Sequence, residues 1–505
     1  MAIKRYFATK DNTITNSFKA DLDTRGTGSN MGQADILEVF SIYGQATTSS
    51  IELERFIVQF NTTDINTDRD DGLLPASGSL KWYLKLFNAR GSTTLPRDFT
   101  LNVHPITATW EEGFGLDMDN YSDITYDVEG SNWIKSGGNT SWTSQGGAYL
   151  ETPNATASFP VGNEDMVLDV TTMVEDWLGD APTRNNYGFI VKLPHAIESG
   201  SLSYYTKKFF ARGSEYFFRR PVLEARWDNR ITDNRGDFYL SSSLVPAEEN
   251  INTLYLYNFV RGKLRDIPGL GVNKHVYVSL FSGTLDNTAP TASALQLVAD
   301  GTHVKSTNNL VVTGGIVSTG IYSASVAFTG SSTMSKLFDV WFTGSLHVSS
   351  AVEATIQFHT GSIDVEKFEG SSYSDSSKYF INFTNLQNGY YPKQSARFRM
   401  FARKKGWSPN IYTVAQATVP TLTFESASYQ ISRVVDDYIV IPYGTGSMYS
   451  TLLSYDVSGN YFDLDIDMLE PGFSYNINVS IYDAAVGSYV EQPYHFKFKV
   501  NQYDY

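Results

Sequence analysis

Apolar and polar side chains alternate with a period of two along several stretches, and this pattern limits the possible fold more than any other feature. In residues 396–403 and again in residues 473–481, every second side chain is apolar and most of those between are polar or charged. Such alternation places one face of an extended strand in a core and the other in solvent. Tyr and Phe, which are enriched in strands, number 32 and 31, and no long stretch has helical spacing. The sequence therefore predicts an all-β protein.

The length of 505 residues predicts more than one domain, because a domain usually spans about 100–200 residues. Two polar stretches divide the chain, residues 228–237 and the Ser-rich residues 369–378. We therefore predict three β domains at residues 1–228, 236–368 and 376–505, of which the second and third are immunoglobulin-like β-sandwiches. Limited proteolysis is expected to cut first near residues 229–235 and near residues 371–377, because polar linkers are mobile.

One short helix is predicted among the strands of the first domain. It follows a strand at residues 167–170, and either Thr171 or Thr172 is expected to cap it. Its apolar side chains fall at helical spacing: Met173, Val174, Trp177 and Leu178. Because isolated helices below about 12 residues are marginal in water, this one must be held by packing over an open end of the sandwich. Trp177 is the expected anchor.

The first domain also carries a spaced set of aromatic and glycine residues that is found in a known family. The set comprises residues 55–60 and 80–87, Trp110-Glu111-Glu112-Gly113, Trp133, Trp142, Gly146-Gly147, Asp169-Val170-Thr171, Trp177, Asn186-Tyr187-Gly188-Phe189, Phe209, Arg212 and Pro221-Val222-Leu223. It resembles the DNRLRE (disaggregatase-related) domain, a β-jelly roll related to carbohydrate-binding modules. The resemblance spans residues 1–228 and implies a jelly roll for the first domain. Its motifs specify a fold better than they specify a function.

The composition excludes several classes of protein. The chain contains no Cys, which rules out disulfide bonds, thiol catalysis and Cys-ligated zinc. It has neither an apolar run of signal-peptide length at its start nor a stretch of 18 apolar residues, so we expect synthesis in a host cytoplasm without a signal peptide and without membrane insertion. The formal net charge of −15 argues against nucleic-acid binding.

The last domain carries a second resemblance. The segments YDVSGNYFDLDIDMLEPGFSY and YHFKFKV, within residues 370–505, are similar in style to virion structural proteins of marine tailed phages, cyanophage-like ones in particular. A β-rich chain without cysteine or an export signal is often part of a virus particle. The resemblance implies localisation to the virion, with other virion proteins as partners and assembly as a homo-oligomer.

No cofactor is expected, although two acidic segments leave room for a structural calcium ion. In the first, oxygen-bearing residues occupy alternate positions ahead of a glycine: Asp64, Asn66, Asp68 and Asp70. A calcium loop would need a bidentate Glu at the twelfth position, where this chain has Pro75. The second segment supplies the candidate metal ligands Asp117, Asp119 and Asp123. Solvated acidic loops are the alternative interpretation of both segments.

Three tryptophans in or beside the loop-rich residues 111–165 are candidate ligand-binding residues: Trp110, Trp133 and Trp142. Flat aromatic rings can stack on the apolar face of a sugar ring. The alternative is that these tryptophans pack against the edge of the sandwich. If Trp133 is a platform, Trp133→Ala should leave the melting temperature nearly unchanged, whereas Trp177→Ala should lower it by many degrees.

A basic face on the last domain is a candidate protein interface. Arg397, Arg399 and Arg403 lie on the strand predicted at residues 396–403 and could contact an acidic neighbouring subunit. A solvated strand face is the alternative interpretation.

No catalytic residue is predicted. The motifs HExxH, GxSxG and the P-loop do not occur, and nothing in the sequence sets the neighbours Glu111 and Glu112 about 5–10 Å apart across a cleft, as glycoside hydrolysis requires. We therefore predict a non-enzymatic structural component of a tailed-phage virion, such as a capsid, neck or tail decoration or a fibre-type protein. A glycan-binding module for host attachment is the alternative function, and a polysaccharide-degrading enzyme is the third.

Overall fold

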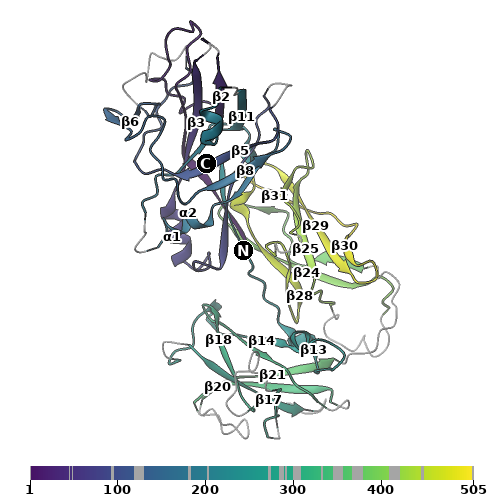
Figure 1. The fold of residues 1–505 in the computed structure, drawn as a ribbon. Coiled ribbons are helices and arrows are strands. Elements are labelled where there is room, and N and C mark those ends of the chain that lie inside the picture. The colour runs from purple at the N-terminus through teal and green to yellow at the C-terminus, as the bar shows by residue number, and fades with distance from the viewer. Residues whose placement is uncertain are drawn as a thin grey trace. The chain divides into compact units, whose positions relative to one another are not determined.

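The structure, a computed structural model, is all-β, and its few helices are short (Figure 1). It describes residues 2–44, 46–47, 49–91, 96–118, 130–179, 184–201, 204–270, 274–283, 289–290, 293–298, 309–330, 334–344, 356–366, 379–408, 421–444 and 449–502, without the side chains of residues 247 and 248. The prediction of an all-β protein is confirmed. The chain divides into two compact units, Met1–Asp228 with Asp467–Glu470 and Asn229–Ile466 with Pro471–Tyr505.

The first unit contains twelve strands among its described residues, together with short helices. The elements are β1 (Ile3–Thr15), β2 (Ile36–Tyr43), β3 (Ile51–Phe60), α1 (Thr62–Asp70), β4 (Leu80–Leu86), β5 (Phe99–Pro105), β6 (Lys135–Gly137), β7 (Thr140–Ser141), β8 (Ala155–Phe159), β9 (Met166–Asp169), α2 (Thr171–Glu175), β10 (Phe189–Lys192), α3 (His195–Glu198), β11 (Tyr204–Phe210), η1 (Phe217–Arg219) and β12 (Val222–Trp227).

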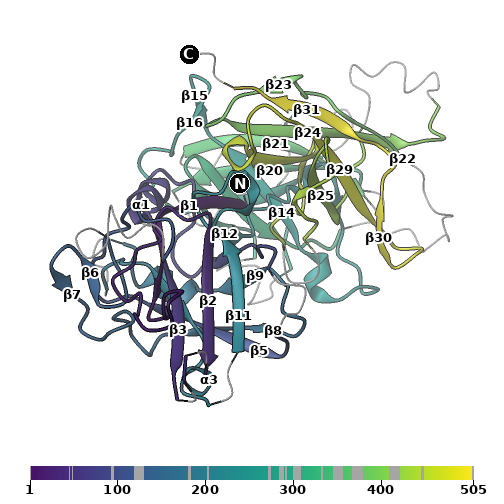
Figure 2. The same cartoon turned by 90° about the horizontal axis from the view of Figure 1, so that it is seen from above.

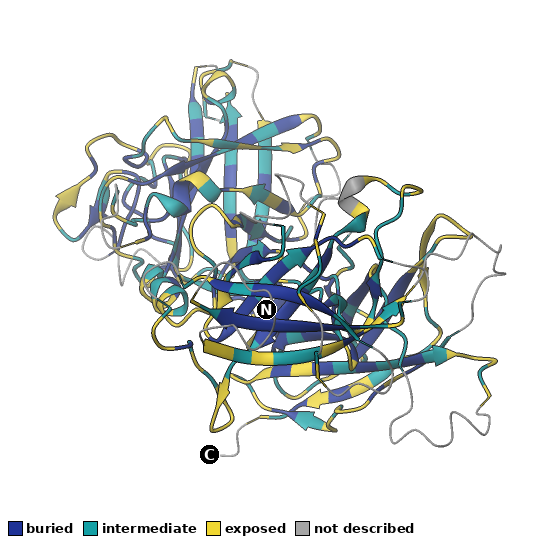
Figure 3. Ribbon diagram, turned by 90° about the horizontal axis from the view of Figure 1, so that it is seen from below, coloured by how far each residue is buried: buried dark blue, intermediate teal, exposed yellow. Residues whose placement is uncertain are grey.

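Ten of these twelve strands form one continuous sheet around the main core of the unit, while β6 and β7, among the described strands, pair only with each other. Its path is β8-β5-β10-β3-β1-β12-β4-β9, and β2 joins β3 to β11, as Figure 2 shows from above. β1 has a bulge between Ala8 and Lys10; its first half pairs with β12 and its second half with β3. The core contains fully buried aromatic side chains such as Trp82, Phe56 and Phe209. Figure 3 shows buried residues along the strands, interspersed with intermediate and exposed ones.

Helix α2 begins differently from the predicted cap. Its N-cap is Val170, which makes no side-chain capping bond, and the Asp169 carboxylate instead accepts a hydrogen bond from the backbone N–H of Thr171. The Thr171 hydroxyl faces the sheet and accepts a hydrogen bond from the backbone N–H of Trp82, 2.9 Å away. The hydroxyl is therefore used to attach the helix to β4, and the prediction of a threonine cap is wrong.

The predicted anchor of this helix is buried. Met173, Val174, Trp177 and Leu178 all belong to the core of the first unit. Trp177 lies just beyond the end of α2, and its ring centroid is 4.7 Å from that of Phe189 on β10. Packing of this kind stabilises a helix of five residues that could not persist alone.

The second unit contains the remaining elements. They are η2 (Asn234–Gly236), β13 (Phe238–Tyr239), η3 (Ala247–Asn250), β14 (Asn252–Tyr257), β15 (Phe259–Val260), β16 (Lys263–Leu264), β17 (Val276–Gly283), β18 (Val312–Ser318), β19 (Ile321–Val326), β20 (Lys336–Thr343), β21 (Ile356–Glu366), β22 (Tyr379–Phe383), β23 (Gly389–Tyr390), β24 (Ser395–Lys404), β25 (Ala427–Arg433), β26 (Ile439–Ile441), β27 (Ser454–Asp456), β28 (Gly459–Asp465), η5 (Ile466–Met468), β29 (Ser474–Asp483), β30 (Ser488–Glu491) and β31 (Phe496–Val500).

The second unit has its main core in residues 238–363, a smaller cluster around Phe281 and Phe342, and further buried aromatic residues near its C-terminus. The main core lies within the sheet β13-β21-β20-β17-β18-β19-β14 and includes Trp341 and Tyr322. The later strands form a four-stranded sheet, β22-β24-β28-β27, and a six-stranded one, β23-β31-β29-β25-β26 with β30 on β29. Between them, Tyr429 stacks on Phe462 at 3.9 Å between ring centroids.

The polar connection after residue 228 is held by hydrogen bonds. The backbone N–H of Ile231 donates to the Ser454 hydroxyl, and the Ile231 carbonyl accepts from Tyr455. Asp233, which is 5% exposed, donates its N–H to the Tyr455 carbonyl. Strand β27 thus supplies partners from Ile231 onward that a local sequence pattern does not reveal, and early proteolysis of residues 229–235 stays a prediction. The Ser-rich break at residues 369–378 lies outside the described residues.

Arg235 attaches the same segment to the sandwich that follows it. Its guanidinium makes a two-pronged ion pair with Asp339 of β20, in which the second prong measures 2.6 Å. Asp339 is fully buried and also accepts a hydrogen bond from the indole N–H of Trp341 at 2.6 Å. A buried carboxylate in this position requires the arginine for charge compensation.

Candidate functional site

The three candidate tryptophans are buried. Trp110, Trp133 and Trp142 are 3%, 6% and 6% exposed, so none of them offers a ring face to a ligand. The indole N–H of Trp110 donates to the carbonyl of Tyr187 at 2.7 Å, and that of Trp142 to the carbonyl of Asn132 at 2.8 Å. Both rings belong to a small second core on the outer side of β3 and β10. The structure therefore favours packing over sugar stacking for these residues.

A buried ionic cluster fixes this loop region to the sheet. Arg55 of β3 makes a two-pronged ion pair with Glu198 at 2.9 and 2.8 Å, and it also donates to the carbonyl of Gly146 at 2.7 Å. Lys192 approaches Glu198 to 3.0 Å. The guanidinium of Arg55 lies 5.1 Å from the ring centroid of Trp133. The cluster thus gives Trp133 a structural partner.

The first of the two acidic segments is helical. Residues 64–70 lie within helix α1, where Asp68 accepts a hydrogen bond from Tyr6 and pairs with Lys4 at 3.0 Å. The calcium-loop interpretation of this segment is therefore wrong. Asp117 is half-buried. The other two candidate metal ligands, Asp119 and Asp123, lie outside the described residues, and the described residues contain no cluster of three metal-ligating side chains.

Two of the three candidate interface arginines are paired within their own sandwich. Arg397 makes a two-pronged ion pair with Asp463 at 2.8 and 2.9 Å, and Arg399 makes one with Asp456 at 2.7 and 2.9 Å. Arg403 is half-exposed and lies beside aromatic rings. The internal pairs leave little unbalanced charge for an acidic neighbour, so the arginine face is a weaker interface candidate than its sequence suggested.

Asp11 of β1, beside Glu112, has a carboxyl group with a raised pKa. Asp11 is 2% exposed, and its carboxylate accepts a hydrogen bond from the backbone N–H of Arg212 at 2.6 Å. The side chain of Arg212 is paired with Glu112. Burial raises the pKa of Asp11 to about 7, with a further contribution from the Glu112 carboxylate and opposition from the hydrogen bond to Arg212.

The raised pKa of Asp11 predicts a pH-dependent stability. The unfolded chain releases this proton near its ordinary pKa of 3.8, whereas the folded chain holds it until about pH 7. Between those values the contribution of Asp11 to the free energy of unfolding falls as pH rises, by up to about 1.4 kcal/mol per pH unit. Asp11→Asn should remove that slope.

Urea unfolding of the full chain at several pH values, followed by tryptophan fluorescence, measures this effect. Six of the eight tryptophans lie in residues 1–228, so the signal reports mainly the first unit. Asp21→Asn, at an exposed position, is the control and should keep the slope. A slope unchanged by Asp11→Asn would contradict the assignment.

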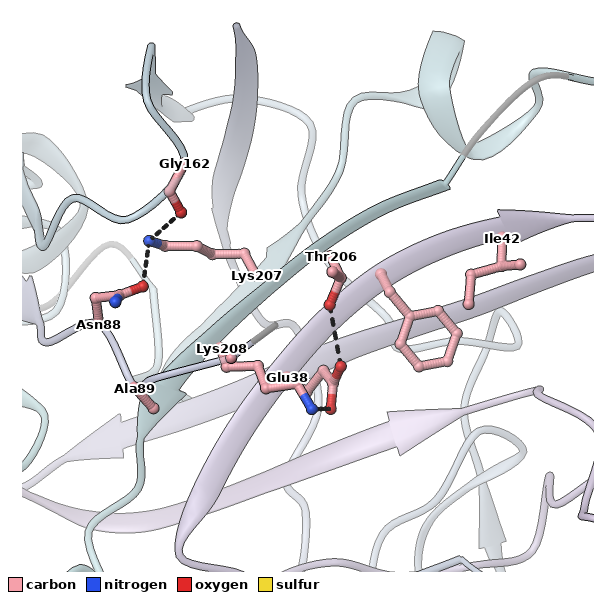
Figure 4. Close-up of a pocket in the computed structure, with 10 residues that line it drawn as sticks. Glu38, Ile42, Asn88, Ala89, Gly162, Thr206, Lys207 and Lys208 are labelled. Carbon is pink, nitrogen blue, oxygen red and sulfur yellow. Dashed lines mark hydrogen bonds and ion pairs between the residues drawn. The ribbon is translucent and has the colours of Figure 1, made fainter. Parts of the chain in front are cut away.

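A pocket of about 290 Å³ opens on the outward face of β2 and β11 (Figure 4). Along β2 the core residues Leu37 and Val39 alternate with outward residues, and the register sets β11 directly beside them. The lining residues come from these strands and from two loops: Glu38, Phe40, Ile42, Asn88, Ala89, Gly91, Gly162, Thr206, Lys207 and Lys208.

The pocket combines an apolar floor with a polar rim. Phe40 and Ile42 are half-exposed, while the Glu38 carboxylate pairs with Lys208 at 3.0 Å and accepts a hydrogen bond from the Thr206 hydroxyl at 3.0 Å. Burial raises the pKa of Glu54, on the adjacent strand β3, well above its usual range, and the charge of Glu38 adds to that shift. The arrangement suits a ligand that has one apolar face and several hydroxyl groups.

Sequence reasoning missed these pocket residues. Residues 34–43 have the pattern of a strand and contain β2, but a strand interpreted from the sequence at residues 209–212 covers only the end of β11 (Tyr204–Phe210). Residues 204–210 read YYTKKFF, in which a Tyr and a Lys occur on each face, so no clear apolar and polar alternation marks the whole strand. What the sequence also lacked was the pairing of β2 with β11, which joins residues more than 160 positions apart.

Comparisons with known proteins leave the family of this chain open. No family model matches it, and no curated protein sequence matches it. Similar solved structures include the titin domains Z1Z2 in complex with telethonin (10% identity, TM-score 0.13, 50% of this chain and 88% of that one) and Escherichia coli alpha-2-macroglobulin (10%, 0.15, 93% and 20%). Another is a tetra-tandem repeat from the extending region of a large adhesion protein (8%, 0.15, 97% and 99%). TM-scores this low do not establish a shared fold.

None of the helices in the described part of the chain is long and apolar enough to cross a bilayer.

Proposed function

We propose that the protein is a non-enzymatic structural component of a tailed-phage particle that acts through protein–protein contacts. Two properties support this proposal. Residues 370–505 are similar in style to virion structural proteins of marine tailed phages. The same part of the chain carries an exposed hairpin whose side chains are typical of protein interfaces. The hairpin is the observation on which the proposal depends.

This hairpin consists of β29 and β30 and the turn between them. Tyr482 and Tyr489 face each other across it at 5.5 Å between ring centroids and are 45% and 40% exposed. Val486 at the turn and Val490 on β30 are 59% and 38% exposed. All four residues of β30 are exposed, and among the described strands β30 pairs only with β29. Exposed aromatic side chains on a free strand edge suit docking by a neighbouring strand or sheet.

Loss of the hairpin aromatics should weaken self-association. If homo-oligomers use this edge, the double variant Tyr482→Ser and Tyr489→Ser should raise the dissociation constant at least about 30-fold, the effect of about 2 kcal/mol at an interface hot spot. Analytical ultracentrifugation of the full chain measures it. The control is Val260→Ser in the exposed β15–β16 hairpin, where Val260 is 48% exposed. Equal dissociation constants for the double variant and the unmodified chain would contradict a contact through β30.

Glycan binding is the second candidate function, and the pocket beside β2 and β11 favours it. A pyranose ring has an apolar face that can lie on Phe40, and its hydroxyl groups can bond to Glu38, Thr206 and Lys208. This candidate sugar site differs from the tryptophan platforms expected from the sequence. Its apolar floor and polar rim support a host-surface polysaccharide as the ligand.

Removal of the apolar floor should weaken such binding. We expect Phe40→Ala to weaken the affinity for any glycan identified on an array about tenfold, as measured by isothermal titration. Val167→Ala, on the exposed side of β9, is the matched control and should bind like the unmodified chain. If Phe40→Ala bound the same glycan with unchanged affinity, the pocket would not be the binding site.

A further inference from the structure

Lys207 of β11 is a lysine in the interior of the first unit. It is 2% exposed, because it alternates with the outward residues Thr206 and Lys208 and therefore points toward the core. Its amine lies 4.8 Å from the ring centroid of Phe159 and 5.2 Å from that of Phe209. Figure 4 shows the amine at the inner end of the pocket, between Gly162 and Asn88.

Asn88 is fixed beside this amine. The backbone of Asn88 forms a β-bridge with Phe209, two residues beyond Lys207, and its N–H donates to the Asp165 carboxylate at 2.7 Å. The next residue, Ala89, donates its N–H to the carbonyl of Lys208 at 3.0 Å. The Asn88 side-chain oxygen lies 2.6 Å from the Lys207 amine. A primary amine and a carboxamide are thus held in contact by backbone hydrogen bonds on both sides.

The surroundings also favour the reactive form of the amine. An amine attacks a carbonyl carbon only when it is neutral. Burial lowers the pKa of Lys207 to about 8, although the charges of Glu164 and Asp165 partly oppose that shift. The carbonyls of Gly162 and Glu164 accept further hydrogen bonds from the amine, at 3.0 and 2.7 Å, and hold it in one position. Effective concentrations for groups held in this way can be very high.

We propose that Lys207 and Asn88 form an intramolecular isopeptide bond. The Lys207 Nζ atom attacks the Asn88 side-chain carbonyl carbon, an amide bond forms between Nζ and that carbon, and the bond from the carbon to Nδ2 breaks. A proton passes from Nζ to Nδ2, which leaves as ammonia. The balance is one neutral amine and one primary amide converted to one secondary amide and one ammonia.

Such a bond would join β11 covalently to the segment that follows β4. The chain has no cysteine, so a disulfide bond cannot supply a cross-link of this kind. The inference does not depend on the proposed virion function, since it rests on Lys207, Asn88 and their immediate neighbours.

The intact mass of the purified full chain tests the proposal. We expect a mass about 17 Da below that of the sequence, the loss of one ammonia. Proteolysis should give one linked pair of peptides, one containing residue 88 and the other residue 207. Lys208→Arg, an outward neighbour on the same strand, should retain the loss, whereas Asn88→Ala and Lys207→Arg should each have the full mass of their sequences.

The unmodified chain alone decides the outcome, so poor folding of a variant would not leave the question open. A mass equal to that of the sequence, with no linked peptides, after prolonged incubation of the folded chain at pH 9 would overturn the proposal. The contact between Lys207 and Asn88 would then be only a hydrogen bond between a buried ammonium group and an amide.

Discussion

Trp133→Ala is expected to destabilise the first unit about as much as Trp177→Ala does, by about 3–5 kcal/mol each. Trp133 is 6% exposed and Trp177 is 4% exposed, so both substitutions leave a cavity of indole size. Trp133 also lies against the guanidinium of Arg55, and its loss would open a buried ion pair to water. Urea unfolding of the full chain, followed by circular dichroism, measures both changes.

Phe114→Ala is the matched control for the loop region. Phe114 is an aromatic residue in the same part of the chain but is 60% exposed, so its removal should change the free energy of unfolding by less than about 0.5 kcal/mol. If Trp133→Ala behaved like Phe114→Ala, Trp133 would be a surface residue and the stacking-platform interpretation would return.

The second large effect is expected from Asp339→Asn, which should destabilise the second unit by about 3–5 kcal/mol. The substitution keeps the shape of the side chain but removes its charge, leaving the half-buried Arg235 guanidinium without its ion pair. Asp339 is fully buried, so water cannot replace the lost interaction. Differential scanning calorimetry of the full chain measures the shift.

Asp463→Asn provides the comparison, because Arg397 and Asp463 form an equally regular pair at the surface. The side chains of that pair are 49% and 26% exposed, and an exposed ion pair contributes about 0–1 kcal/mol. Asp339→Asn, but not Asp463→Asn, should also speed proteolysis between residues 229 and 237, because the ion pair with Asp339 fixes Arg235 in that segment. Equal calorimetric shifts for the two variants would mean that the Asp339 pair is not isolated from solvent.

The sequence predicted the features that local patterns determine. A two-residue period is a property of each strand, so the all-β class and the strand at residues 473–481 followed from it. The burial of Trp177 followed because a helix of five residues needs a large apolar contact. These inferences required no knowledge of which segments meet in space.

Most of the failures share a physical cause, which is that the deciding partner lies far away in the chain. Gly, Ser, Thr and Asn around Trp133 suggest an exposed loop, but Arg55 and Glu198, 143 residues apart, form the ion pair beneath it. The acidic residues 64–70 imitate a calcium loop, whereas Asn61 caps a helix there and buried Ile65 attaches it to the core. The pocket and the Lys207–Asn88 contact likewise depend on long-range pairing.

Immunogold labelling of purified phage particles tests the proposed structural role most directly. Antibodies raised against the purified full chain would be applied to particles purified from a lysed host culture, with particles treated with pre-immune serum as the control. We expect gold at one defined position on each particle, the same from particle to particle. Particles without label, prepared from a lysate whose soluble fraction contains abundant antigen, would contradict the proposal.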